Sequence, residues 1–94
     1  IEQMATKKVN YTKSGVNKLP DDKPVLYRIQ TECGKDNYVG VAQRGRVRER
    51  IEEHIGEIPG SMVSIEQFES IDAARDKEAK VIKQEQPKYN EQGK

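Results

Sequence analysis

Tryptophan does not occur among the 94 residues of this chain, and phenylalanine and cysteine occur once each. Because the single cysteine, Cys33, has no partner within the chain, an internal disulfide framework and a cysteine-rich zinc site are both excluded. No apolar run approaches the roughly 20 residues that a membrane span needs, and residues 1–4 show no hydrophobic secretion signal. We therefore expect a cytoplasmic protein without a membrane partner.

Apolar residues are few, so the core must be small. They make up 33% of the chain, whereas charged residues make up 35%. A chain of this length fits one compact domain whose core is built from Ile, Val, Leu, Ala and Tyr side chains. The sequence starts with Ile1 rather than Met, which is compatible with a piece of a longer protein whose other domain or partner carries specificity.

Charge is unevenly distributed, although the formal net charge is only +1. Residues 1–50 carry 11 Lys and Arg against 6 Asp and Glu, and residues 51–94 carry 6 against 10. The basic half ends in four arginines at alternate positions, which would suit contact with a phosphate backbone. They are Arg44, Arg46, Arg48 and Arg50. Alternatively, they pair with nearby glutamates on an exposed helix face, at spacings of three or four residues.

The first 22 residues show no periodicity of apolar positions. They are polar and lysine-rich, and they contain a Ser14-Gly15 break, a composition typical of a flexible basic arm. The lysines of the arm are either simply solvated or follow a nucleic-acid strand. The folded domain is expected over residues 23–94.

Alternating apolar and β-branched residues predict a β-hairpin from residues 25–31 and 37–42. Pro24 suits the first position of the leading strand, because proline cannot donate to a ladder. Residues 62–69 predict a third strand with Val63 and Ile65 on one face. The sheet is therefore expected to have three strands.

Two helices are predicted beside these strands. Apolar residues recur every three or four positions from Val47 to Ile58, which predicts an amphipathic helix that packs on the hairpin. Ser70 is a suitable N-cap for a second helix, which Pro87 would end. The sequence thus predicts an α+β fold: a small three-stranded antiparallel sheet with flanking helices.

Glu78 is unexpected on the second predicted helix. Position 78 falls on the apolar stripe of that helix, seven residues after Ile71. An unpaired buried carboxylate is unfavourable, so it would need a cation, hydrogen-bond donors or a metal ion. Alternatively, Glu78 lies at the edge of the stripe and reaches water.

Four other side chains could act with Glu78. Arg50 and His54 are one helical turn apart, and an arginine fork suits the oxygens of a phosphate. Tyr27 and Tyr38 lie on adjacent strands of the predicted hairpin, where both hydroxyls could share one face. The alternative is that His54 and the tyrosines are packing residues, as strand tyrosines usually are. A tyrosine hydroxyl has a pKa of about 10, so a neighbouring cation must lower it before it can act as a base.

The order of these residues resembles the GIY-YIG nuclease family over residues 25–90. That family has paired tripeptides on two hairpin strands, a catalytic Arg with His or Tyr one turn later, a metal-binding Glu on a later helix, and an Asn near the end. The matching segments are Val25-Leu26-Tyr27, Tyr38-Val39-Gly40, Arg50 with His54, Glu78, and Pro87-Lys88-Tyr89-Asn90. The first tripeptide keeps the tyrosine and loses the glycine of the family.

The resemblance implies a metal-dependent DNA endonuclease, which hydrolyses phosphodiester bonds with one Mg²⁺ or Mn²⁺ held by Glu78. Arg50 would stabilise charge on the phosphate, and Asn90 would hold the scissile region. Contacts to the DNA backbone would come from Arg44, Arg46, Arg48 and Lys88.

The resemblance leaves several assignments open. Tyr27 is the preferred base for the attacking water, but Tyr38 or His54 could take that role. Arg50 matches the family only if two residues are inserted after the second tripeptide, and otherwise Arg48 takes the catalytic place. A different class is also open: a nucleic-acid-binding or interaction module that keeps the fold without catalysis. The near-neutral charge and the lost glycine favour that alternative.

Overall fold

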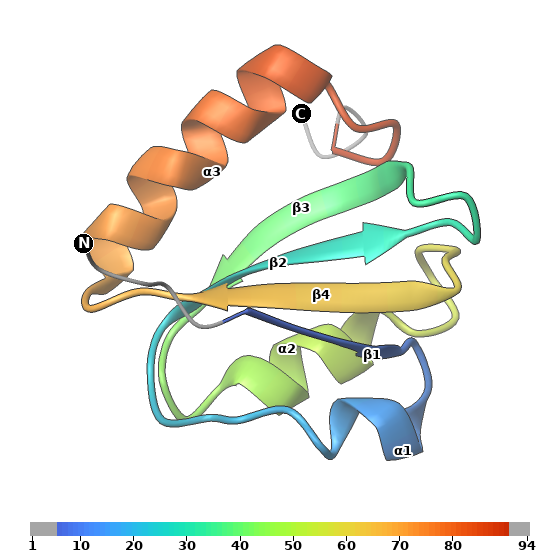
Figure 1. Ribbon diagram of the computed structural model, residues 1–94, viewed down its shortest axis with the longest axis horizontal. Helices are drawn as coiled ribbons and strands as arrows, with labels where there is room; N and C mark the ends of the chain where they lie inside the picture. The colour runs from blue at the N-terminus through green and yellow to red at the C-terminus, as the bar shows by residue number, and fades with distance from the viewer. Residues whose placement is uncertain (1–5, 91–94) are drawn as a thin grey trace.

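The structure is a computed structural model that describes residues 6–90. The chain forms one antiparallel sheet in the strand order β1-β4-β2-β3, with helices on both faces (Figure 1). The elements are β1 (Thr6–Asn10), α1 (Lys13–Val16), β2 (Val25–Gln30), β3 (Asp36–Ala42), α2 (Val47–His54), β4 (Met62–Gln67) and α3 (Ile71–Glu85). The predicted α+β class is confirmed, but the described sheet has four strands rather than three.

The predicted hairpin is β2 and β3, and it sets the two tyrosines on one face. Tyr27 pairs with Gly40 and Ile29 pairs with Tyr38 across the strands. Because alternate residues of a strand share a face, Tyr38 lies diagonally across from Tyr27 on the same side. On its other side β2 pairs with β4, so β2 is central and β3 lies at an edge of the sheet.

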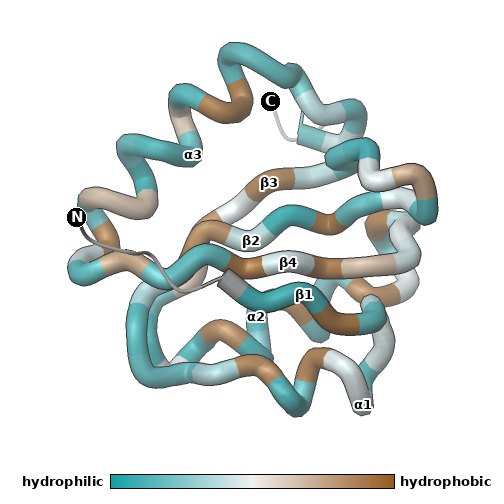
Figure 2. The backbone as a smooth tube through the Cα atoms, in the orientation of Figure 1, coloured by the Kyte–Doolittle hydropathy of each residue, from teal (hydrophilic) through white to brown (hydrophobic). Residues whose placement is uncertain are grey.

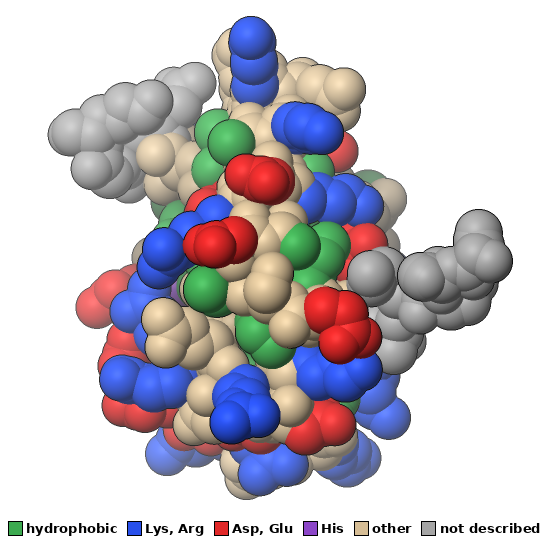
Figure 3. All heavy atoms as spheres, turned by 90° about the vertical axis from the view of Figure 1, so that its left-hand side faces the viewer, with side chains coloured by type: hydrophobic (Ala, Val, Ile, Leu, Met, Phe, Trp, Pro, Cys, Tyr) green, Lys and Arg blue, Asp and Glu red, His purple; other side chains and the backbone are tan. Residues whose placement is uncertain are grey.

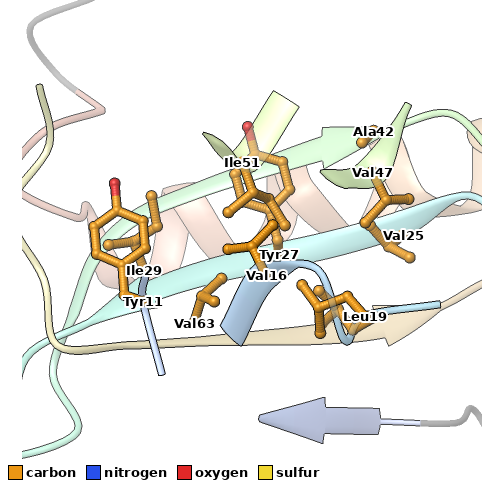
Figure 4. Packing of buried hydrophobic residues seen from close by; sticks show 11 residues of the cluster. Tyr11, Val16, Leu19, Val25, Tyr27, Ile29, Ala42, Val47, Ile51 and Val63 are labelled. Atoms are coloured by element: carbon orange, nitrogen blue, oxygen red, sulfur yellow. The ribbon is translucent and has the colours of Figure 1, made fainter. Parts of the chain in front are cut away.

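Two small cores lie on opposite faces of the sheet. Helices α1 and α2 cover one face and α3 covers the other (Figure 1). The first core holds Tyr11, Val16, Leu19, Val25, Tyr27, Ile29, Ala42, Val47, Ile51, Val63 and Ile65 (Figure 4). The second holds Leu26, Val39, Phe68, Ala74 and Val81. Neighbouring residues on a strand point to opposite faces, and Figure 2 shows the resulting changes of hydropathy along β2 and β4.

The ends of α3 follow the predicted signals. The Ser70 hydroxyl accepts a hydrogen bond from the Ala73 N–H at 3.2 Å, which is the interaction expected of an N-cap. At the other end Gln86 is left-handed, with φ of 47°, and Pro87 follows it. Among residues 6–90, α3 and the other helices are too short or too polar to cross a membrane.

The predicted flexible arm is wrong for residues 6–22. Strand β1 pairs with β4 over five residues, and Tyr11, Val16 and Leu19 are buried in the first core. The Asp21 carboxylate accepts a hydrogen bond from the Val47 N–H at 2.8 Å, which ties this segment to the start of α2. The apolar residues responsible are scattered across a short strand, a single helical turn and a loop, so they show no period. Residues 1–5 of the predicted arm lie outside the described part of the chain.

Candidate functional site

Tyr27, Tyr38 and His54 form a cluster beside the edge strand β3. The Tyr27 Oη lies 2.8 Å from His54 Nε2, at hydrogen-bond distance. The Tyr38 ring centroid is 4.8 Å from that of His54 and 6.1 Å from that of Tyr27. The pairing of β2 with β3 and the last turn of α2 therefore bring together three residues that lie far apart in the sequence.

Gly40 provides the space that Tyr27 occupies. A Cβ atom at position 40 would lie 2.7 Å from the Tyr27 Oη and 2.8 Å from its Cζ. Such distances are well inside van der Waals contact, so a larger residue would force the tyrosine ring to move. Gly40 thus allows the Tyr27 ring to lie across β3. Val25, which stands where the family has its first glycine, is wholly buried in the first core.

Tyr27 is a buried hydroxyl that stays protonated. The residue is 0% exposed, and burial is the largest cause that raises its pKa above 10. The neighbouring Tyr38 raises the pKa further. These features do not suit the preferred sequence assignment of Tyr27 as the base, because a base must reach water and release its own proton. Tyr38 and His54, both partly exposed, are better placed.

His54 is neutral at pH 7. Burial lowers its pKa from the ordinary value of 6.5, and the nearby Arg50 charge lowers it further. Glu53 and Glu57 act in the opposite direction but do not cancel the effect. A neutral imidazole has one nitrogen that donates and one that accepts, so His54 can bind Tyr27 through Nε2 and still use Nδ1.

The lowered pKa of His54 predicts a pH dependence of folding. Below about pH 6.5 the unfolded chain binds a proton at this position while the folded chain resists it. The free energy of unfolding should therefore fall as the pH is lowered from 7 towards 5. His54→Gln, which keeps a polar partner for Tyr27 but does not titrate, should show a weaker fall. Urea unfolding of both proteins across this range measures the difference. Equal pH dependence in the two proteins would contradict a depressed pKa, since carboxylates such as Glu78 contribute to both.

Arg50 and Glu78 both act electrostatically on Tyr27, although they come from opposite faces of the sheet. The Arg50 charge lowers the pKa of Tyr27 and the Glu78 charge raises it. Helix α3 makes more contacts with β3 than with any other strand, so Glu78 is carried along the edge where the tyrosine cluster lies. The structure thus brings Tyr27, Tyr38, Arg50 and His54 together on the face that α2 covers, whereas Glu78 belongs to the helix on the other face.

Glu78 lies at the edge of the apolar stripe of α3 rather than within it. Its side chain is half-buried, and burial raises the pKa of the carboxyl above the usual 4.5, while the Arg75 charge partly offsets this. No ion pair or side-chain hydrogen bond within residues 6–90 involves this carboxylate. Glu78 is therefore a partly desolvated carboxylate available to a cation.

A groove beside the cluster joins α2 to α3. It has a volume of about 300 Å³ and is lined by Val41, Ala42, Gln43, Arg46, Arg50, Ile71 and Arg75. Figure 3 looks at this end of the molecule and shows Lys and Arg side chains along its left margin, with Asp and Glu among them. Sequence reasoning missed Arg75, although its position three residues before Glu78 places both on one side of the helix.

The other predicted nucleic-acid contacts are dispersed. Arg46 lines the groove, and the exposed Arg44 lines the hollow next to it. Arg48 does not line the groove: its Nε donates to the Leu19 carbonyl at 2.8 Å, on the side of α1. Lys88 stands over the ring of its neighbour Tyr89, with Nζ 5.6 Å from the centroid. Of the two candidate catalytic arginines, Arg50 is therefore the one beside the cluster.

Asn90 has a structural place that differs from its predicted contact with substrate. Its Oδ1 accepts from the Val39 N–H and its Nδ2 donates to the Val39 carbonyl, both at 2.8 Å. An edge strand leaves such backbone groups without a neighbouring strand, and a side-chain amide offers the matching donor and acceptor. Asn90 therefore anchors the end of the described chain to β3.

The side chains near the cluster fit only a metal ion that takes few of its ligands from the protein. In the described part of the chain, no three His, Cys, Asp or Glu side chains group closely enough to hold a metal by themselves. Mg²⁺ is commonly held by one or two carboxylates, with waters and substrate phosphates completing its shell. A single available carboxylate, Glu78, beside an arginine-lined groove fits this mode and does not fit a structural zinc or calcium cage.

Comparison with known proteins adds no assignment. No protein-family model matches the chain, and no curated protein matches it.

Proposed function

We propose that this chain is a metal-dependent DNA endonuclease of the GIY-YIG kind, which hydrolyses phosphodiester bonds with one Mg²⁺ or Mn²⁺. The observation that carries the proposal is the cluster of Tyr27, Tyr38 and His54, with the Tyr27 Oη 2.8 Å from His54 Nε2, beside a groove lined by arginines that include Arg50. Arg50 lies one turn before His54 on α2, and Glu78 comes from α3, which packs against β3 from the other face of the sheet.

Glu78 and Arg50 have different roles at the phosphate. Glu78 would hold the ion, which would supply positive charge to the phosphate and to the leaving oxygen. Arg50 offers its guanidinium to the phosphate oxygens, a geometry that suits charge developing in the transition state. Its present partner is Glu53 at 3.7 Å on an exposed surface, which is a weak pair that a phosphate can displace.

His54 takes the proton of the attacking water. The Tyr27 hydroxyl oxygen can accept the Nε2–H of His54, from which it lies 2.8 Å away. In that tautomer Nδ1 is unprotonated and can accept a proton, and the lowered pKa keeps the imidazole neutral at pH 7. Tyr27 is then a positioning residue, and Tyr38 orients the water.

A nucleic-acid-binding module without catalysis is the second candidate. The complete burial of Tyr27 favours it, because the residue at the centre of the cluster cannot itself contact a substrate. The arginine-lined groove would serve both functions, whereas a partly desolvated Glu78 serves only the first.

Cleavage assays separate the two candidates. The purified chain should cut supercoiled plasmid or oligonucleotide substrates, whether duplex, branched or single-stranded, in Mg²⁺ or Mn²⁺ and not in EDTA. Binding of the same substrates without cleavage in either metal would reject the nuclease and favour the binding module. Cutting that persists in EDTA would reject the role given to the metal.

A further inference from the structure

Three arginines from two helices converge on the groove between α2 and α3. Arg46 and Arg50 come from α2 and its N-cap position, and Arg75 comes from α3. Among the described residues that line the groove there is no Asp or Glu, and Gln43 adds an uncharged donor and acceptor. The groove thus offers several cationic donors to an anionic ligand.

The arginines are held only weakly by other side chains. The Arg46 Nε is 3.3 Å from Glu49 and the Arg50 Nη1 is 3.7 Å from Glu53, in pairs whose side chains are all about half exposed. Exposed pairs of this kind contribute little and exchange readily. Arg75 is exposed and forms no ion pair within residues 6–90. All three guanidinium groups are therefore available.

The groove leads away from the candidate catalytic residues. At one end it contains Arg50, and Arg75 lies one turn before Glu78 on α3. At the other end a second hollow of about 550 Å³ shares Gln43 and Ile71 with the groove. It carries two cations, Lys23 and Arg44, and two carboxylates, Asp22 and Glu69. Lys23 is paired with Glu69 at 3.2 Å, so the second hollow adds only Arg44 to the three arginines of the groove. The groove and Arg44 together form a basic path with apolar patches, which suits a chain of phosphates, sugars and bases.

We infer that this path binds the DNA strand on one side of the cleavage position, with Arg75 and Arg46 on the phosphodiester next to the one that is cut. The inference rests on the proposed function for the position of the cut, but the binding itself does not require cleavage. Arg50 lies between the groove and the tyrosine cluster, since it lines the groove and precedes His54 by one turn of α2.

Salt-dependent binding tests the path without chemistry. Fluorescence anisotropy in EDTA would measure the affinity of the full chain for a fluorescein-labelled oligonucleotide at several KCl concentrations. Arg75→Gln should weaken binding several-fold at low salt. It should also reduce the slope of log affinity against log salt by about 0.7 to 0.9, the value of one lost phosphate contact.

Lys80→Gln is the matched control. It removes the same charge from the same helix, from an exposed position about 140° around the axis from residue 75. It should leave the slope unchanged. The inference would be overturned if Arg75→Gln and the wild type had equal slopes, or if Arg75→Gln and Lys80→Gln lowered the slope equally.

A cleavage assay with modified substrates identifies which phosphate Arg75 binds. Each substrate carries one neutral methylphosphonate in place of a phosphodiester. When that replacement lies next to the cut, it should slow cleavage by the wild type and have little added effect on cleavage by Arg75→Gln. Additive effects of the two changes would overturn the assignment of Arg75 to that phosphate. A wild type that binds with an Arg75-dependent slope but never cuts would keep the path and reject the nuclease.

Discussion

The Glu78→Gln variant is expected to lose cleavage by about 10²-fold to 10³-fold or more, the scale on which positioned charge-stabilising groups act. Glutamine keeps the size of the side chain and one acceptor oxygen but carries no charge to hold a divalent ion. Because the carboxylate is half-buried and raised in pKa, its replacement by an amide should leave the fold intact or slightly stabilised. Initial rates over a range of Mg²⁺ concentrations measure the loss.

Asp76→Asn provides the control for this prediction. It neutralises an exposed carboxylate on the same helix, two residues before Glu78 and on another side of it. It should cleave at the wild-type rate. Unchanged cleavage by Glu78→Gln, with both variants equally folded by circular dichroism, would remove the metal site from the proposal.

Arg50→Gln is expected to reduce the single-turnover cleavage rate by a similar factor, about 10²-fold to 10³-fold. The guanidinium is the cation beside the cluster, and it influences the pKa values of both Tyr27 and His54. Its loss removes the bidentate partner of the phosphate and also the charge that lowers those pKa values. Saturating enzyme concentrations separate this effect from weaker DNA binding.

Arg48→Gln distinguishes a catalytic arginine from a structural one. Its Nε holds the Leu19 carbonyl at 2.8 Å, so the substitution should lower the free energy of unfolding by about 1 kcal/mol and leave the single-turnover rate unchanged. If Arg50→Gln cleaved at the wild-type rate and Arg48→Gln cleaved slowly, the catalytic place would belong to Arg48.

The elements that are predictable from sequence have strong local signals. The hairpin, α2, β4 and α3 follow from alternation, from the spacing of Val47 and Ile51, and from the Ser70 cap. The shared face of Tyr27 and Tyr38 follows from the register of the hairpin. In these segments the local preference and the tertiary packing point to the same structure.

The parts that were missed depend on pairing between distant segments. Within residues 7–10 of strand β1, only Val9 is partly buried, and the strand is held by β4 more than fifty residues away. No local period reveals such a strand. Asn90 and Arg75 were missed or misassigned for the same reason, since their surroundings come from β3 and α2.

The burial of Tyr27 was also beyond local reasoning. Its ring fits only because the cross-strand partner is Gly40, and that partner depends on the register of the hairpin. A strand tyrosine is typically a packing residue with a hydroxyl that reaches outward. Here Tyr27 is fully buried with its hydroxyl beside His54, whereas Tyr38 is only partly buried.

The turn after α3 has a consequence for self-association. Tyr89 donates its N–H to the Asn37 carbonyl at 2.9 Å, and Asn90 occupies the donor and acceptor of Val39. Those backbone groups would otherwise be a template on which a strand from a second molecule could polymerise. At the opposite margin, Lys7 and Lys8 bring repelling charge to any incoming copy. The two edge strands are thus protected from pairing with another molecule in different ways. On β3 the Asn90 side chain occupies the backbone groups of Val39, and on β1 the lysines repel a second copy.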